Sequence, residues 1–319
     1  MATILLTGAN GFVGSHVLPE LLRPELGHEV LALVRSRKAG DAVLDALPAA
    51  DRERVRLRTG DVTEPATLRP AMAGADAVVH LVAIPRDFNG GRDLARVNTE
   101  GTRNVVQAAR AAGVLRFVHL GAMGVVDDPR LHYAGSKARA ERLVADSGLD
   151  ATILKPSLMW GEGDGFFSLI ALLARLSPGL IPVPGRGDAR FQPLYVGDLA
   201  RVIALVLDRP ETGGHAYELG GPRYWTYREI TAEVLAALGK QRLIVPMPVP
   251  LISLVARLSE MVHVPFPVAS DQLRQLKLDN IGPLDLIERE FGFAPRPMDA
   301  QLGYLRGRGR RTGIAPRQA

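Results

Sequence analysis

The first half of the chain alternates short apolar runs with longer helical patterns. Runs rich in valine, isoleucine and leucine lie near residues 2–7, 29–34, 55–59, 76–82, 115–120 and 150–155. Helical patterns fit between them, for example at 93–112 and at 133–147, where Gly148 follows the last turn. This alternation predicts parallel strands joined by crossover helices. We therefore expect an α/β fold with a Rossmann-type doubly wound parallel sheet.

The alternation fades beyond residue 155, where proline and glycine become frequent. The stretch "LSPGLIPVPGRGDARFQP" at 176–193 predicts loops over a pocket. We expect a Rossmann-type domain at 1–155, to which 190–220 returns, and a smaller C-terminal lobe for substrate or partner at 156–305. Asp198 is expected to cap a helix that runs to about Leu207. Phe191, Gln192 and Tyr195 are candidate pocket residues, although packing explains each of them equally well.

Composition removes several classes of function. The chain of 319 residues has no cysteine, which excludes disulfides, thiolate catalysis and cysteine-ligated metals. Its net charge of +5 lies in the tail "RGRGRRTGIAPRQA" at 306–319, which has five arginines and no acid. Because residues 1–305 are then neutral, we expect no nucleic-acid partner. The tail is expected to be disordered, with an anionic membrane or an acidic partner as the alternative. No metal site is expected.

Two segments bear on location. A strand pattern follows the first methionine directly in "MATILLTG", which favours a cytoplasmic protein. The segment "LISLVARLSEMV" at 251–262 has one apolar helical face but is shorter than the roughly 20 residues that span a bilayer. Core packing is the ordinary interpretation of that face. The alternative is a surface helix at the inner face of a membrane or against a partner subunit.

A glycine-rich turn follows the first predicted strand. "TGANGFVG" places three glycines at G-x-x-G-x-x-G spacing before a helix, which lets the backbone approach a pyrophosphate at the helix N-terminus. Pro19, inside that helix, predicts a kink or an early end. The residues expected to bind the dinucleotide here are Gly8, Asn10, Gly11, Phe12, Val13 and Gly14.

The end of the second strand, "EVLALVRSRK", bears on cofactor choice. An NAD-selective site places an acid there to bind the ribose 2′-hydroxyl. Arg35 stands at that position, with Arg37 and Lys38 after it, and these cations suit a 2′-phosphate. We therefore expect NADP(H), with NAD(H) less favoured.

Further motifs carry a family resemblance. With "GDV" at 60–62, "HLVA" at 80–83, "VNTEGTRNVV" at 97–106 and "YAGSK" at 133–137, the chain resembles the extended short-chain dehydrogenases/reductases. "ILKPSLMWGEGDGF", "RFQPLYVGDLARVI" and "SDQLRQLKLDN" resemble an atypical branch that includes the NADPH-binding accessory subunit of respiratory complex I and its bacterial relatives. The resemblance implies further cofactor contacts at Asp61, Val62, Leu81, Val82, Ala83, Lys137 and Pro156.

The same resemblance implies Asn98, Tyr133 and Lys137 as catalytic residues. Lys137 favours the phenolate of Tyr133, which exchanges a proton with the substrate oxygen. Residues 119–126 contain no serine or threonine to orient that oxygen, and Gly121, a pocket candidate with Met123, stands where many branch members have a serine. His119, Ser136 or a water are conceivable substitutes. Lys155 replaces the arginine usual before the following proline.

The sequence is compatible with three functions. The favoured one is hydride transfer between nicotinamide and a small, fairly apolar carbonyl or alcohol. The second is a non-catalytic NADPH-binding accessory subunit or assembly factor of a respiratory complex, because the chain keeps the cofactor site and lacks the serine. The third is a nucleotide-sugar epimerase or dehydratase, which the pocket segments support less because they offer few cations for a diphosphate.

Overall fold

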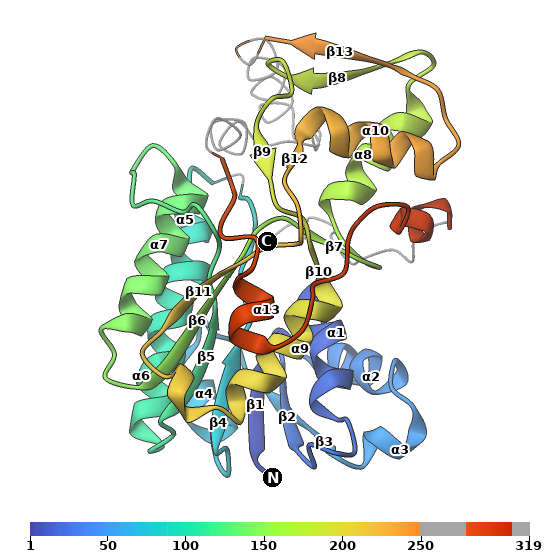
Figure 1. Cartoon of the computed structure of the whole chain (residues 1–319). Helices are drawn as coiled ribbons and strands as arrows, with labels where there is room; N and C mark the ends of the chain where they lie inside the picture. The colour runs from blue at the N-terminus through green and yellow to red at the C-terminus, as the bar shows by residue number, and fades with distance from the viewer. Residues whose placement is uncertain (88, 249, 251–278, 308–319) are drawn as a thin grey trace.

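The computed structural model of the chain describes residues 1–87, 89–248, 250 and 279–307. The amphipathic face expected at 251–262 and residues 308–319 of the basic tail lie outside the described residues. Figure 1 shows two regions, a large lobe around a central sheet and a smaller lobe built on α8 and α10.

The central sheet has seven parallel strands in the order β11-β6-β5-β4-β1-β2-β3. The six strands expected from the sequence all form, and a seventh joins the sheet from the segment expected to return to this domain. The predicted doubly wound fold is therefore confirmed. The strands are β1 (Thr3–Thr7), β2 (Glu29–Val34), β3 (Val55–Thr59), β4 (Ala77–His80), β5 (Arg116–Leu120), β6 (Asp150–Pro156) and β11 (Ala216–Leu219).

The strand order reverses between β1 and β4. The chain runs outward from β1 to β2 and β3, and then returns to place β4 on the other side of β1. Leu5 of β1 pairs with Leu31 of β2 on one side and Val78 of β4 on the other. In open parallel sheets ligands bind at the carboxyl ends of the strands at such a switch point.

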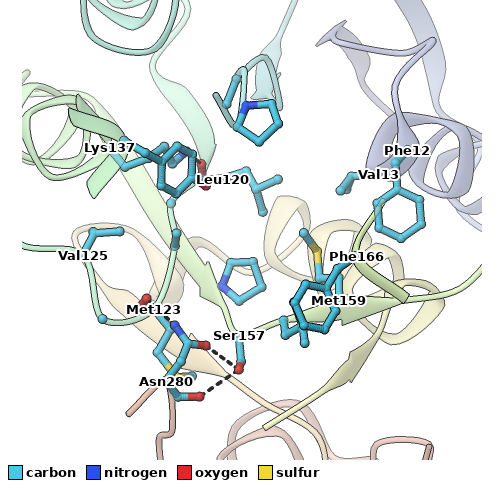
Figure 2. Close-up of a pocket in the computed structure, with 18 of the residues that line it drawn as sticks. Phe12, Val13, Leu120, Met123, Val125, Lys137, Ser157, Met159, Phe166 and Asn280 are labelled. Carbon is cyan, nitrogen blue, oxygen red and sulfur yellow. Dashed lines mark hydrogen bonds between the residues drawn. The ribbon is translucent and has the colours of Figure 1, made fainter. Parts of the chain in front are cut away.

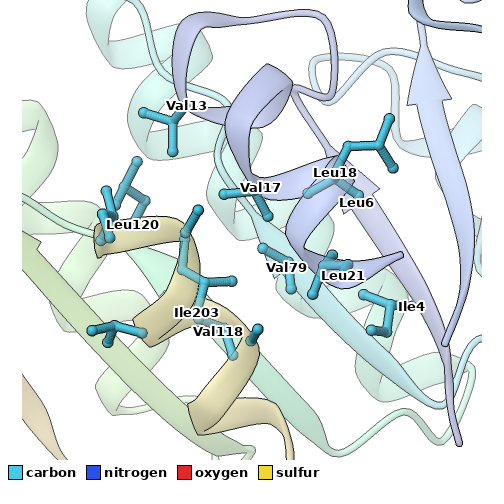
Figure 3. Packing of buried hydrophobic residues seen from close by; sticks show 14 of the residues in the cluster. Ile4, Leu6, Val13, Val17, Leu18, Leu21, Val79, Val118, Leu120 and Ile203 are labelled. Carbon is cyan, nitrogen blue, oxygen red and sulfur yellow. The ribbon is translucent and has the colours of Figure 1, made fainter. Parts of the chain in front are cut away.

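Helices cover both faces of the sheet (Figure 1). On one face Val17 and Leu21 of α1 and Ile203 of α9 pack against Ile4 and Val118, which point to that side (Figure 3). On the other face α4, α6 and α7 pack against alternate strand residues such as Leu5 and Phe117. The helices of this lobe are α1 (Phe12–Leu21), α2 (Arg37–Asp45), α3 (Ala49–Arg52), α4 (Pro65–Ala71), α5 (Arg92–Leu94), α6 (Gly101–Ala111), α7 (His132–Ala145), α9 (Val196–Leu207), η2 (Pro210–Thr212) and α13 (Leu286–Phe291).

The helix expected at 93–112 is interrupted. A π-helical segment, η1 (Ala95–Glu100), lies between α5 and α6 and carries Asn98 at its centre. The Asn98 side chain binds the backbone of Ile84, a long-range contact that sequence periodicity does not report. Such π segments are frequent at functional sites.

One local expectation is wrong, and one of the two effects expected of Pro19 is not seen. Asp198 does not cap α9, which begins at Val196 after Tyr195; its Oδ2 accepts a hydrogen bond from the backbone N–H of Arg296 at 2.6 Å instead. Pro19 does not end α1 early, because the helix continues to Leu21.

The smaller lobe contains short strands where loops were expected at 176–193. Strand β8 pairs in parallel with β13, and β9 pairs with β12. These partners are distant in sequence, so local pattern did not reveal them. The α13 segment, expected in this lobe, packs instead into the core of the large lobe through Leu286 and Phe291. The elements are β7 (Met159–Trp160), α8 (Phe166–Leu176), β8 (Leu180–Pro184), β9 (Arg190–Phe191), β10 (Leu194–Tyr195), β12 (Trp225–Thr226), α10 (Tyr227–Ala237), β13 (Leu243–Met247) and η3 (Leu302–Arg306).

Among the helices of the described residues, none combines the length and apolar character needed to cross a bilayer.

Candidate active site

A pocket of about 490 Å³ opens at the carboxyl ends of the central strands. Its wall includes Gly8 after β1, Leu81 after β4, Gly121 after β5 and Pro156 at the end of β6. Figure 2 shows Val13 and Phe12 on one side of this space, Leu120 and Lys137 on another, and Asn280 with Ser157 at a third. The pocket therefore occupies the switch point of the sheet and also reaches the smaller lobe.

The glycine turn has the geometry of a pyrophosphate cradle. Gly8 has φ +77°, and its carbonyl accepts a hydrogen bond from the N–H of Gly11 at 2.9 Å. A Cβ on Gly14 would lie 2.1 Å from the Gly8 oxygen, so only glycine lets α1 pack this closely on the turn. The helix has no acidic residue in its first turn. Its N–H groups and positive end therefore suit an anionic phosphate.

The residues expected around the adenine half lie outside the pocket wall. Arg35 is exposed directly after β2, and Ser36 caps α2, which begins with Arg37. Asp61 is held by the N–H and hydroxyl of Thr63, both at 2.8 Å. The expected cofactor residues that do not line the pocket are Asn10, Arg35, Asp61, Val62 and Val82; those that do are Gly8, Gly11, Phe12, Val13, Gly14, Leu81, Ala83, Lys137 and Pro156.

Tyr133 and Lys137 lie one turn apart on α7 and both line the pocket. Burial raises the pKa of Tyr133 to about 12, and the nearby charge of Glu141 acts in the same direction. Burial lowers the pKa of Lys137 to about 8, and Glu141 opposes this shift. The Lys137 ammonium donates a hydrogen bond to the carbonyl of Leu120 at the end of β5. At neutral pH the site therefore holds a protonated phenol beside a cation.

Asn98 does not line the pocket but supports the residues that do. Its side chain accepts a hydrogen bond from the N–H of Ile84 at 2.8 Å and donates to the Ser136 hydroxyl at 3.0 Å. Ser136 in turn donates to the backbone carbonyl of Tyr133 at 2.7 Å. This chain of bonds fixes the first turn of α7 against the loop after β4.

Neither side chain considered as a substitute for the missing serine faces the pocket. Ser136 is fully buried in the bonds with Asn98 and Tyr133. His119 is buried within β5, stacks on His80 with ring centroids 5.5 Å apart, and has both ring nitrogens without a partner among the described residues. Burial lowers the pKa of His119 well below its usual value.

Gly121 lines the pocket as expected, but a side chain at this position would point into protein. A Cβ there would lie 2.5 Å from Oε1 of Glu141 and 3.1 Å from the Lys155 side chain. Glu141 Oε1 accepts a hydrogen bond from the N–H of Ala122 at 2.9 Å, and Lys155 pairs with the same carboxylate at 3.7 Å. A serine at 121 would therefore displace Glu141 rather than project into open space.

The half of the pocket that lies away from the glycine turn, toward the smaller lobe, is apolar. Lys137 is the one cationic side chain and Asp279 the one acid among the lining residues described. Met123 and Phe191 line it as expected. The remaining apolar wall consists of Leu158, Met159, Phe166, Leu169, Ile170, Leu173 and Tyr227.

Two expected pocket residues lie elsewhere. Gln192 is fully buried, where its amide donates to the carbonyl of Gly221 at 2.8 Å and accepts from the N–H of Gly282 at 2.8 Å. Tyr195 packs on Trp160, with ring centroids 4.7 Å apart, and beneath the guanidinium of Arg296. Because these contacts hold both side chains away from the cavity, they connect segments of the fold and do not form the pocket wall.

Sequence reasoning missed Ser157, Asn280 and the residues of α8. The signal for the first two was present in "KPS" and "LDN", which belong to the segments that carried the family resemblance. For α8, the apolar positions of "FFSLIALLARL" predicted nothing about a ligand, because a core helix has the same pattern.

Comparison with known proteins assigns the chain to a family. Residues 4–220 match the model of the NAD-dependent epimerase/dehydratase family. The chain belongs to this family. Its fold is that of the extended short-chain dehydrogenases/reductases, which confirms the resemblance inferred from the motifs.

Relatives within the family differ in their roles. The chain is 30% identical over 265 residues to a 2-alkyl-3-oxoalkanoate reductase from Stenotrophomonas maltophilia, covering 75% of this chain and 76% of that one. It is 26% identical over 303 residues to subunit 9 of the NADH dehydrogenase 1 alpha subcomplex of Arabidopsis thaliana mitochondria, covering 94% and 74%. A solved dTDP-glucose 4,6-dehydratase from Streptomyces venezuelae with NAD bound superposes with a TM-score of 0.72 at 27% identity, covering 95% and 96%. Membership of the family therefore leaves the three functions open.

Proposed function

We propose that this protein is an NADP(H)-dependent oxidoreductase that acts on a small, fairly apolar carbonyl or alcohol. The observation that carries the proposal is that Tyr133 and Lys137 line the same pocket as the glycine turn at the N-terminus of α1. When bound, the nicotinamide supplies or accepts a hydride at its C4 atom. The chain provides the proton donor, a nearby cation and a largely apolar cavity.

Tyr133 acts as the acid in carbonyl reduction. With a pKa near 12 its phenol keeps its proton at neutral pH and donates it to the substrate oxygen as charge develops there. The positive charge of Lys137 stabilises the phenolate that remains. Asn98 and Ser136 position the turn that carries Tyr133, so Asn98 acts as a positioning residue.

Arg35 supports NADP(H) over NAD(H). It is exposed at the end of β2, where a carboxylate would repel a 2′-phosphate, and Arg37 and Lys38 follow in the first turn of α2. These cations suit bidentate and single contacts to phosphate oxygens. Asp61 and Val62 are assigned to the adenine side by the same reasoning.

The apolar wall supports a substrate with a hydrocarbon body. α8 contributes Phe166, Leu169 and Leu173 to the pocket, and burying such surface is what binds an apolar ligand. A nucleotide sugar would bring two phosphate charges, which Lys137 alone among the described lining residues would have to meet. The relative named as a 2-alkyl-3-oxoalkanoate reductase fits this preference.

A non-catalytic NADPH-binding accessory subunit or assembly factor remains the second candidate. The relative from Arabidopsis thaliana mitochondria, whose alignment covers 94% of this chain, favours it. So does the absence of a serine or threonine from 119–126. In that role Tyr133 and Lys137 would hold the cofactor. The protein would then be cytoplasmic or lie peripherally at the inner face of a membrane.

Turnover separates the two candidates. The purified protein is tested for co-purifying NADPH and then for loss of the NADPH absorbance band with ketones, aldehydes and quinones, using Tyr133→Phe as the control. Oxidation that the variant loses supports the enzyme. Stoichiometric NADPH without turnover, unchanged in the variant, supports the accessory subunit. Binding of UDP-sugars in place of apolar ketones would support the epimerase alternative.

A further inference from the structure

Asn280 joins the smaller lobe to the turn after β5 and lines the pocket. Its backbone N–H donates to the carbonyl of Arg190 at 2.9 Å. Its backbone carbonyl accepts a hydrogen bond from the Ser157 hydroxyl at 2.8 Å, and its side-chain Oδ1 is a second acceptor for that hydroxyl. Its Nδ2 donates to the carbonyl of Met123 at 2.6 Å. Figure 2 shows Asn280, Ser157 and Met123 together at one end of the cavity.

The direction of each bond follows from the chemistry of the partners. The carbonyl of Met123 can only accept, so the atom that faces it must be the amide nitrogen of Asn280. The Ser157 hydroxyl already accepts from the N–H of Gln192 at 3.1 Å and has one proton to give, which points to Asn280. The network therefore fixes which way the Asn280 amide is turned.

One proton of this amide is left for a ligand. The nitrogen carries two protons, and the carbonyl of Met123 is the acceptor that the structure records for it among the described residues. Asn280 is half-buried and lines the pocket, so a ligand bound in the cavity is within reach as the second acceptor. Met123 is part of the turn that follows β5, where related enzymes are expected to place a serine hydroxyl. The amide thus lies against the turn that lacks one.

We propose that the side-chain amide of Asn280 donates the hydrogen bond that orients the substrate oxygen, in the role for which residues 119–126 supply no hydroxyl. This inference rests on the proposed function. In the reduction the carbonyl carbon takes the hydride, the π-electron pair moves to the oxygen, and the proton of Tyr133 completes the alcohol. Asn280 transfers no atom; it stabilises the charge that develops on oxygen.

The test compares kcat, KM and NADPH affinity for the full chain and its variants with whichever ketone the wild type reduces. Asn280→Ala is expected to lower kcat by roughly 100- to 1,000-fold, the usual effect of removing one such donor. Asn280→Asp keeps the size and the acceptor for Ser157 but loses both protons at neutral pH, so it is expected to be equally slow. The matched control is Tyr224→Phe. It removes a 2.8 Å hydrogen bond to the carbonyl of Gly282, which lies in the same segment as Asn280, and Tyr224 does not line the pocket. Its kcat is expected to change less than about threefold.

A rescue variant distinguishes orientation from support of the fold. Ala122→Ser in the Asn280→Ala background returns a hydroxyl to the turn after β5, and it is expected to recover at least tenfold in kcat with NADPH affinity unchanged. Wild-type rates in both Asn280 variants would overturn the inference, and so would loss of NADPH binding together with turnover, because Asn280 would then act through the fold alone. Failure of the wild type to reduce any ketone would instead remove the proposed function.

Discussion

At the scale of single residues, burial decides the chemistry of Tyr133 and Lys137. The phenol has its pKa raised to about 12, while the ammonium has its pKa lowered to about 8. A protonated tyrosine beside a lysine that is charged at neutral pH suits proton donation, which is the reductive direction. The charge of Lys137 is lost as the pH rises through about 8, whereas the proton of Tyr133 is not.

This difference predicts the pH dependence of reduction. We expect kcat for ketone reduction to be constant from about pH 6 to about 7.5 and to fall about tenfold per pH unit above about 8, as Lys137 loses its charge. Steady-state rates across this range measure it, with NADPH affinity followed as the control for cofactor loss. A rate that rises above pH 8 would show that the cation is not needed.

His119 predicts a second pH effect, on stability. Burial holds its folded pKa far below that of the unfolded chain, so the unfolded state takes up a proton first as the pH falls. Protonation of His119 therefore does not affect the free energy of unfolding above about pH 6.5, and it lowers that free energy as the pH falls below this value. We expect the His119→Leu variant to have a melting temperature at or above that of the wild type at pH 7. We also expect its melting temperature to fall less than that of the wild type between pH 7 and pH 5. Equal losses in both proteins, measured by thermal unfolding, would show that His119 is hydrated or paired.

That Tyr133 and Lys137 share one helix face followed from their spacing, while their catalytic role is what the family resemblance implies. The three glycines were noticed because they follow a strand directly. The misplacement of Gln192 and Tyr195 has a physical cause. Both are polar or aromatic residues near a pocket segment. The sequence does not reveal that Gln192 already bonds the carbonyl of Gly221 or that Tyr195 already packs on the indole ring of Trp160. Asn280 was missed because its partners Met123 and Ser157 are more than a hundred residues away.

At the scale of elements, the turn between β1 and α1 depends on its third glycine. The missing side chain of Gly14 lets the helix lie against the carbonyl of Gly8 and aim its N-terminus at the pocket. The alternation of strands and helices around it was predictable, since buried parallel strands are continuous apolar runs. The π segment at Asn98 and the pairing of β8 with β13 were not, because tertiary contacts decide both.

Gly14→Ala tests this packing. A Cβ at 2.1 Å from the Gly8 oxygen has to push helix and turn apart, an overpacking that costs about 1–3 kcal/mol. We expect the NADPH dissociation constant to rise about 10- to 100-fold, measured by the fluorescence of bound NADPH. Gly165→Ala is the control, because a Cβ there meets nothing within 4 Å. An unchanged affinity in Gly14→Ala would show that the cofactor does not use this turn.

At the scale of the whole molecule, η3 packs against α8 and α10 in the smaller lobe. Asp164 is buried. Its carboxylate accepts hydrogen bonds from the backbone N–H groups of Phe167 and Ser168 and from the hydroxyl of Tyr304, the last at 2.6 Å. Burial raises the pKa of Asp164 to about 6, and these hydrogen bonds oppose the shift. The carboxylate thus links the start of a pocket helix to η3.

Tyr304→Phe removes the shortest of these hydrogen bonds. Because the buried carboxylate loses a donor, we expect the free energy of unfolding to fall by about 1.5–3 kcal/mol at pH 7.5. The loss is expected to shrink toward pH 5, where Asp164 takes up a proton and needs the donor less. Denaturant unfolding at the two pH values measures this. A loss that is the same at both would contradict the assignment of the charge to Asp164.

The most direct test of the central claim is transfer of deuterium from NADPH that carries deuterium at both C4 positions to the alcohol formed from an apolar ketone, measured by mass spectrometry. We predict one deuterium per product molecule with the wild type, and a rate at least 100-fold lower with Tyr133→Phe although that variant still binds NADPH. Product without deuterium, or deuterium transfer at the wild-type rate in Tyr133→Phe, would contradict a reductase that works through this site.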